Sequence, residues 1–304
     1  MSSHRHGALS LILSVTSLAL SLCGAATSQV LFGPVQPAAS AATPALVRFG
    51  FADVNDDGLP DLVTANGGAI SWRPGDGTGH FSAASTPVPG TTGTEILLED
   101  LDGDGRNDLI ATTSSTATVQ IALAERGGFL PPVTLALGGP AGVTARVGTG
   151  DADGDGDSDL LAVLVGNASF AGQAQLYLND GRGTLSAGAV VTGSEPNRVN
   201  GGVAASLDGN GEPDLVIVTV AAGVPTSTVW LGQPGGTVSA GFAAPGLWLT
   251  DIDDIDGDGD ADLVAPTTAL LEPVVVRSYL GAGDGSFTAK SACRTNGASR
   301  STSV

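Results

Sequence analysis

The sequence predicts an all-β fold, a β-propeller of four-stranded antiparallel blades, and three observations support this prediction. The chain is rich in Gly and poor in aromatic residues, and Val, Thr, Ala and Leu are interrupted by Gly, Asp, Asn and Pro. This composition is typical of short strands and many turns. An acidic segment recurs five times along the chain, and a pair of apolar residues around a Gly-rich turn recurs with it.

The N-terminal residues 1–28 are predicted to be a signal peptide. A short basic stretch precedes an apolar run over residues 8–22, and small residues follow. This run is shorter than the roughly 20 apolar residues of a transmembrane helix. A membrane anchor and a lipoprotein attached at Cys23 are alternatives. After cleavage only Cys293 is left, so we expect no internal disulfide. The predicted signal peptide indicates secretion to the periplasm, the cell surface or the medium. We expect no membrane span in the cleaved chain.

The acidic segments define the repeat. Each ends in Asp-Leu, and their first residues are 47, 51, 55 and 48 residues apart. Such a period is the signature of a repeat architecture. The five segments are residues 53–62, 100–109, 151–160, 206–215 and 254–263.

A second landmark divides each repeat into strands. An apolar or aromatic residue is followed by a Gly-rich hairpin turn and another apolar residue. We therefore expect one strand before the acidic loop, one after it, one ending at the landmark and one after the turn. Because a single such sheet cannot bury both faces, the repeats are predicted to be propeller blades. The pairs are Trp72/Phe81, Ile121/Phe129, Tyr177/Leu185, Trp230/Val238 and Tyr279/Phe287.

These motifs resemble a known family. Asp-Leu-Val or Asp-Leu-Ile follows the acidic loop, and Tyr-Leu-Asn-Asp-Gly at 177–181 or Tyr-Leu-Gly-Ala-Gly-Asp-Gly-Ser-Phe at 279–287 follows later. Together they resemble the FG-GAP/VCBS repeats over roughly residues 30–288. The resemblance implies a calcium-binding propeller of the kind found in integrin α-chains and in secreted bacterial proteins.

We expect the propeller to occupy residues 29–288 and to have about five blades, with a disordered or aberrant tail over 289–304. Phe32 aligns with the starts of fourth strands at Phe81 and Phe129. The N-terminal strand is therefore expected to complete the last blade and to remove its exposed edge. Propellers of this family more often have seven or eight blades, so a truncated seven-bladed propeller is the alternative.

The acidic loops are predicted calcium sites. Numbering each loop from its first residue, carboxylates or amides stand at positions 1, 3 and 5, Gly at 6 and Asp at 9. Calcium binds six to eight oxygen ligands, and Gly at position 6 permits the turn that brings the carbonyl of position 7 and the side chain of position 9 to the ion. An EF-hand is excluded because position 12 is not acidic and the flanks are strand-like.

The predicted ligands follow this pattern in four loops, and the fourth loop keeps only its positions 3, 5 and 9. They are Asp53, Asn55, Asp57, Leu59 and Asp61 in the first loop, and Asp100, Asp102, Asp104, Arg106 and Asp108 in the second. They are Asp151, Asp153, Asp155, Asp157 and Asp159 in the third loop, Asp208, Asn210 and Asp214 in the fourth, and Asp254, Asp256, Asp258, Asp260 and Asp262 in the fifth.

The charge distribution agrees with four to five bound Ca²⁺ ions. The five segments hold 21 of the 31 acidic residues, and like charges this close together repel unless a cation lies among them. In the fourth loop Ser206 replaces the first Asp, so this site is expected to be the weakest or to be empty. The ions would stabilise a fold without disulfides.

The sequence favours a binding function. The formal charge of −19 argues against nucleic acid. His80 is the only histidine after the leader and lies in a predicted turn, and no Gly-x-Ser-x-Gly motif occurs, so no enzyme is expected. We expect a monomeric, non-catalytic adhesion or protein-interaction module with an extracellular protein or glycan ligand. A carbohydrate-binding lectin-type propeller is the alternative, and the propeller of a polysaccharide-active enzyme is a more distant one. Trp248 either stacks on a sugar or packs between blades.

Overall fold

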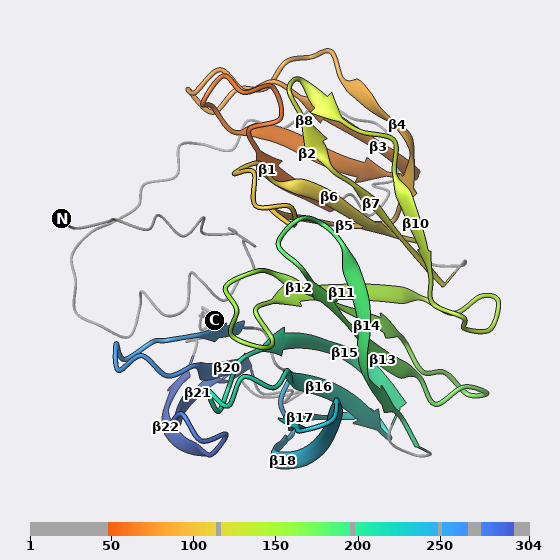
Figure 1. Ribbon diagram of the computed structural model, residues 1–304. Helices are drawn as coiled ribbons and strands as arrows, with labels where there is room; N and C mark the ends of the chain where they lie inside the picture. Colours follow the sequence, from red (N-terminus) through yellow and green to blue (C-terminus); the bar gives the residue numbers. More distant parts are fainter. Residues whose placement is uncertain (1–47, 114–116, 195–197, 249–250, 267–274, 295–304) are drawn as a thin grey trace, which may run out of the picture.

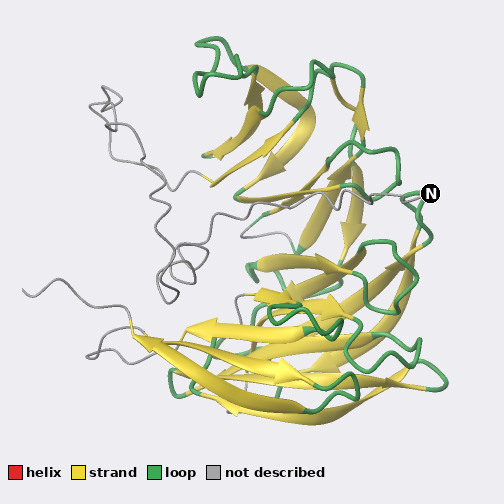
Figure 2. Ribbon diagram, turned by 90° about the vertical axis from the view of Figure 1, so that its left-hand side faces the viewer, coloured by secondary structure: helices red, strands yellow, loops and turns green. Residues whose placement is uncertain are grey.

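The computed structural model describes residues 48–113, 117–194, 198–248, 251–266 and 275–294. They form five four-stranded antiparallel sheets that follow one another around an arc (Figure 1). Figure 2 shows the sheets one above another, with the loops at the strand ends. This all-β arrangement of blade-like sheets is the predicted one.

Each sheet contains strands from one repeat, in chain order from the inner to the outer edge. The first comprises β1 (Arg48–Ala52), β2 (Asp61–Asn66), β3 (Gly68–Arg73) and β4 (Thr86–Gly93). The second comprises β5 (Glu95–Glu99), β6 (Asp108–Thr112), β7 (Thr118–Ala122) and β10 (Val133–Ala136). The third comprises β11 (Ala145–Gly150), β12 (Asp159–Leu164), β13 (Gln173–Asn179) and β14 (Leu185–Thr192).

The fourth sheet comprises β15 (Arg198–Ala205), β16 (Asp214–Ala221), β17 (Val224–Gln233) and β18 (Thr237–Pro245). The fifth comprises β19 (Asp251–Asp253), β20 (Asp262–Pro266), β21 (Val275–Gly281) and β22 (Phe287–Arg294). In the second repeat a small two-stranded sheet, β8 (Ala124–Glu125) and β9 (Gly128–Phe129), forms the hairpin tip.

The second strand of each sheet lies at the centre of the packing. In β12 every residue is buried. Leu160 and Ala162 pack with the second sheet, whereas Leu161 and Val163 pack with the fourth. Because successive side chains of a strand point to opposite faces, a strand covered on both faces is apolar almost throughout.

Position 2 of each acidic loop packs each sheet on the next. Val54, Leu101, Ala152 and Leu207 are 0–3% exposed and belong to core clusters that join consecutive sheets. The corresponding Ile255 of the last repeat is 36% exposed. In the described part of the chain no core cluster joins the fifth sheet to the first.

Among the described residues β22 supplies the fourth strand of the fifth sheet, and the N-terminal strand expected to complete this blade lies outside them. The chain turns back at Gly283 and Gly285, both with positive φ, and β22 pairs with β21 from Phe287 to Arg294. This local hairpin needs far less loop-closure entropy than a strand from the other end of the chain. β22 also runs six residues past 288, the expected end of the domain. Phe32 and the predicted signal peptide lie outside the described residues.

Candidate metal centres

The acidic loops all lie at one end of their sheets. Each connects the first strand to the second, and the Gly-rich hairpin between the third and fourth strands is at the same end because neighbouring strands are antiparallel. The loop of one repeat therefore meets the hairpin of its own repeat and that of the next.

Position 9 anchors each loop to its sheet. In all five repeats this aspartate is 0% exposed. One carboxylate oxygen accepts the amide of position 2 at 2.8–3.0 Å, and the other accepts an amide after the third strand, or at its end, at 2.6–2.9 Å. A buried carboxylate needs such donors. The five residues are Asp61, Asp108, Asp159, Asp214 and Asp262.

Position 1 shapes the turn of the loop. The carboxylate of Asp100 accepts the amides of Gly103 and Gly105, both at 2.9 Å. These two glycines have φ of +72° and +89°, a region that favours glycine. In the first loop Asp56 takes position 4 with φ of 62°. The glycines therefore let the loop close around the carboxylates.

Three loops bring carboxylates together as a cation site would. In each, oxygens of positions 1, 3 and 9 lie within 4.8 Å of one another. This oxygen-only donor set suits a hard cation such as Ca²⁺. The groups are Asp100, Asp102 and Asp108, then Asp151, Asp153 and Asp159, then Asp254, Asp256 and Asp262.

The first and fourth loops form no such group among the described residues. Position 3 of the first loop is Asn55, whose amide nitrogen donates to Asp57 at 3.0 Å, although Asp53 and Asp61 take their expected places. The fourth loop has Ser206 at position 1 and keeps only Asp208 and Asp214 as aspartates. Its weaker binding stays a prediction.

Positions 5 and 7 are not part of these three groups. The carboxylate of position 5 accepts the amide of position 7, as between Asp155 and Asp157 at 3.0 Å. The side chain of Asp157 lies against the hairpin at Gly181, where an added Cβ would be 2.2 Å from its oxygen. Asp260 lies against Gly283 in the same way. The side chain of position 7 therefore lies towards the hairpin, and ligation by its carbonyl stays a prediction.

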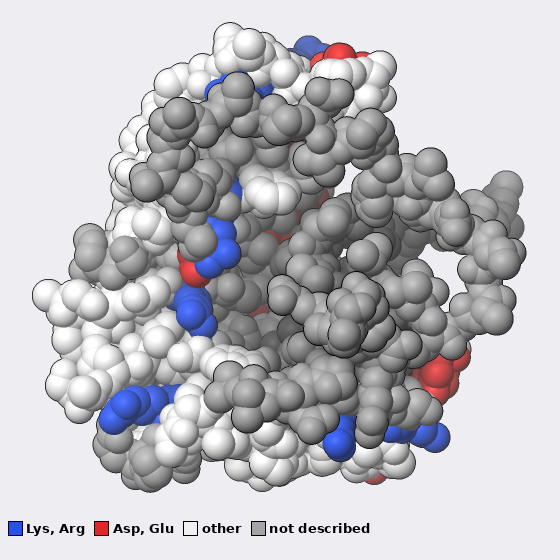
Figure 3. Space-filling model, turned by 180° about the vertical axis from the view of Figure 1, so that it is seen from behind, with Lys and Arg blue, Asp and Glu red and all other residues white. Residues whose placement is uncertain are grey.

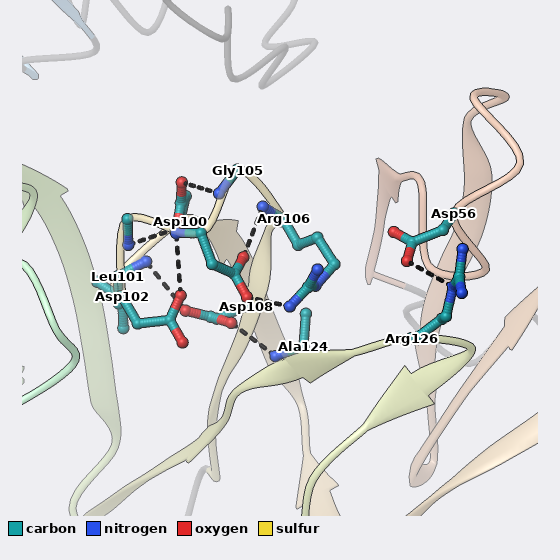
Figure 4. A network of polar contacts seen from close by, with 11 residues as sticks. Asp56, Asp100, Leu101, Asp102, Gly105, Arg106, Asp108, Ala124 and Arg126 are labelled. Atoms are coloured by element: carbon teal, nitrogen blue, oxygen red, sulfur yellow. Dashed lines mark hydrogen bonds and ion pairs between the residues drawn. The ribbon is translucent and has the colours of Figure 1, made fainter.

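The second loop carries a competing cation (Figure 4). Arg106 at position 7 forms an ion pair with Asp104 at position 5. Arg126, from the tip between β8 and β9, forms another with Asp56 of the first loop at 3.6 Å. Arg106 therefore neutralises one of the carboxylates that the sequence assigns to Ca²⁺.

Burial changes the acidity of position 9. It raises the pKa of Asp108 and of Asp159 to about 6, although two backbone amides donate to each carboxylate and oppose the shift. Burial also raises the pKa of Asp214. Protons and cations therefore compete for these groups in mildly acidic solution.

The loops also connect consecutive sheets. The carbonyl of Leu101 accepts the side-chain amide of Asn179 at 2.7 Å and the backbone amide of Gly183 at 3.0 Å. The carbonyl of Ala152 accepts the amide of Asp214 at 3.0 Å. A cation that orders a loop would thus order the junction between two sheets.

His80 lies in a hairpin turn, as predicted. Its side chain is 84% exposed, and Nδ1 lies 3.8 Å from Asp76. Trp248 is half-buried and lines a cavity on the inner side of the arc. The sequence offered no signal that Trp248 and the inner strands share a cavity.

The comparison with protein families decides the kind of repeat. The model of the FG-GAP-like repeat matches residues 100–162, which include the second and third acidic loops. The chain contains an FG-GAP-like repeat. A search of curated proteins gives no match to it.

Solved structures resemble the fold of this protein. A lectin of Agrocybe aegerita, described as recognising non-reducing terminal N-acetylglucosamine, has 20% identity and a TM-score of 0.55. The alignment covers 82% of this chain and 66% of the lectin, just under two thirds. A variant of the Aleuria aurantia lectin in complex with Fucα1-6GlcNAc has 12% identity and a TM-score of 0.46, with coverages of 84% and 79%. In the described part of the chain we find no helix with the length and hydropathy to span a membrane.

Proposed function

We propose that this protein is a secreted or surface-exposed calcium-binding propeller that binds carbohydrate without catalysis. The observation that supports carbohydrate binding is the similarity in fold to the Agrocybe aegerita lectin over 82% of the chain. Carbohydrate binding is therefore favoured over an adhesion or protein-interaction module. The chain would act as a monomer.

Calcium is proposed to have a structural role at four or five loops. At a free concentration ten times the dissociation constant, each ion would stabilise the fold by about 1.4 kcal/mol. Four or five ions would then contribute about as much as the whole net stability of a small domain. The loops that carry three clustered carboxylates would bind most tightly, because more charged ligands raise the affinity.

The chemistry of the described residues argues against catalysis. The buried carboxylates are engaged in loop hydrogen bonds, and His80 is exposed in a turn without an enclosing cleft. General acid–base catalysis needs such a group positioned beside a substrate.

A glycan array with the leaderless protein tests the carbohydrate proposal. We expect saturable binding to a restricted set of glycans in excess calcium, and its loss in EDTA as the junctions loosen. Binding only to extracellular proteins or whole cells, with no glycan retained, would contradict it and favour the adhesion module.

A further inference from the structure

The inner side of the arc is hollow. The first strands of consecutive sheets contact one another, β1 with β5, β5 with β11 and β11 with β15, so they line this side. A cavity of about 560 Å³ lies against β5, β11 and β15, with Trp248 and Ile252 on its wall. Cavities of this size hold small organic ligands.

Glycines of β11 and β15 form part of the cavity wall. An added Cβ would be 2.7 Å from the carbonyl of Gly202 at Gly148, and 2.1 Å from that of Ala204 at Gly150, so these glycines let β11 and β15 approach closely. A Cβ at Gly201 would meet nothing within 4 Å. Gly201 also lines the cavity, so a larger side chain there would extend into empty space.

The cavity contains a positioned guanidinium group. Arg146 Nη1 donates to the backbone carbonyl of Asn200 at 2.9 Å and to its side-chain oxygen at 2.8 Å. Arg48 stands five residues before its own loop, as Arg146 does, but Arg48 is paired with Glu95 at 3.4 Å. None of the ion pairs among the described residues involves Arg146. Its other nitrogens are therefore available to an anionic ligand.

Trp248 lies at the same end of the cavity as Arg146. Trp248 donates its backbone amide to Pro266, the last residue of β20, at 3.5 Å. Pro266 is at the end of β20 away from the acidic loop, and Arg146 is near the corresponding end of β11. An indole presents an apolar face that suits the apolar face of a sugar ring.

The cavity differs at its other end. Glu99 lines it beside the loop, where the hydroxyl of Ser158 donates to Oε1 at 2.7 Å. Four residues of strand separate this level from that of Arg146, or about 13 Å. Figure 3 shows basic side chains beside a hollow on one face of the molecule, with acidic side chains next to them and deeper inside.

We propose that this cavity binds an acidic saccharide, with the carboxylate of a uronate at Arg146 and its ring against Trp248. The guanidinium fork matches a carboxylate in two parallel hydrogen bonds. Sugar hydroxyls would donate to Glu99 at the other end. This inference rests on the proposed carbohydrate binding and names its site and ligand class.

Calorimetric titration with uronate trimers tests the inference. Trimers of galacturonate, glucuronate and mannuronate are added to the leaderless protein in excess calcium. The methyl ester of each trimer serves as the matched neutral sugar. We expect at least one free acid to bind, and its ester to bind at least about tenfold more weakly, because a charge-assisted bidentate pair is lost.

Two pairs of variants locate the site. Arg146→Gln should weaken binding of the acid at least about tenfold, whereas Arg146→Lys should keep part of it. Gly201→Leu should fill the cavity and abolish binding, whereas Gly201→Ala should bind as the wild type does. Thermal melting in calcium shows whether each variant is folded.

Each outcome separates the two proposals. If the acid binds but the variants at 146 and 201 bind it unchanged, the cavity is the wrong site, and carbohydrate binding stands. Equal binding of acid and ester overturns the acidic ligand. If an array shows other glycans bound but no uronate trimer binds, this inference alone fails. If no glycan binds the wild type, both proposals fail.

Discussion

At the scale of single residues, position 9 separates two roles of the acidic loops. Both oxygens of Asp159 accept backbone amides, from Ala152 and from Asn179, each at 2.8 Å. Asp155 at position 5 is exposed and accepts one amide. The buried aspartate therefore supports the fold with or without a cation, whereas the exposed carboxylates matter mainly to the cation.

Asp159→Asn should destabilise the protein by about 2 kcal/mol, because an amide places a donor opposite one of the two amide donors. The loss should be seen in denaturant unfolding both in calcium and in EDTA. Asp155→Asn is the matched control and should lose stability only in calcium. Equal stability of Asp159→Asn and the wild type in EDTA would contradict the anchoring role.

Arg106→Asp should strengthen calcium binding at the second loop about tenfold, because it frees Asp104 and adds the acid found at position 7 of the third and fifth loops. Calcium titration by calorimetry would measure it. Arg126→Ala is the control, since its partner Asp56 is at position 4 and is no expected ligand. An unchanged affinity in Arg106→Asp would show that position 5 does not contribute to the site.

At the scale of elements, the loop and the hairpin act together. The amides that position 9 accepts come from the loop and from the third strand or the turn that follows it, and the next repeat donates to carbonyls of the loop. The aspartates at position 9 whose pKa is raised by burial lie where the loop and the hairpin meet.

The stabilising effect of calcium should therefore depend on pH. The folded pKa of Asp108 and Asp159 is about 6, above the ordinary value of 3.8. In metal-free protein the raised pKa of these two carboxyl groups stabilises the folded state. This stabilisation is fully present below pH 3.8 and is lost as the pH rises through about 6. Calcium needs the ionised form, and at pH 5 each group would be about 90% protonated, which lowers the affinity of its loop about tenfold.

Thermal melts from pH 5 to pH 7 would measure this dependence. The difference in midpoint between calcium and EDTA should grow across that interval. A constant difference would mean that position 9 does not titrate in the competition with calcium.

The sequence predicts the strands of the second repeat, except that the fourth strand begins later than expected. Phe129 was expected to begin the fourth strand, but it lies in β9, and β10 begins at Val133. Pro131 and Pro132 intervene, and proline has no amide to donate to a ladder. The turn signal was correct, and the proline pair moves the strand.

At the scale of the whole molecule, repetition made most of the fold predictable. Five loops at near-constant spacing gave five sheets, and the Gly-rich turns gave the hairpins. The sequence could not show which strand pairs with β21, because β22 and an N-terminal strand offer the same hydrogen-bonding groups. Nor could it give the inner cavity, since Arg146 and Asn200 meet only when sheets are stacked.

Calcium should raise the melting midpoint of the whole protein by many degrees, because the loops join consecutive sheets and order them together. Magnesium, with its smaller size and stricter geometry, should raise it much less. The comparison needs only melts in calcium, magnesium and EDTA. Coincident curves would show that the loops are no stabilising sites.

The packing of position 2 has a consequence for how such chains change in evolution. Each repeat presents an apolar residue that its successor covers, as Leu101 is covered by the third sheet, and Ile255 shows the same residue uncovered. A duplicated repeat would carry both halves of this junction and would fit at any boundary. Gain or loss of whole repeats is then tolerated, whereas gain or loss of part of a repeat would leave an apolar face in water.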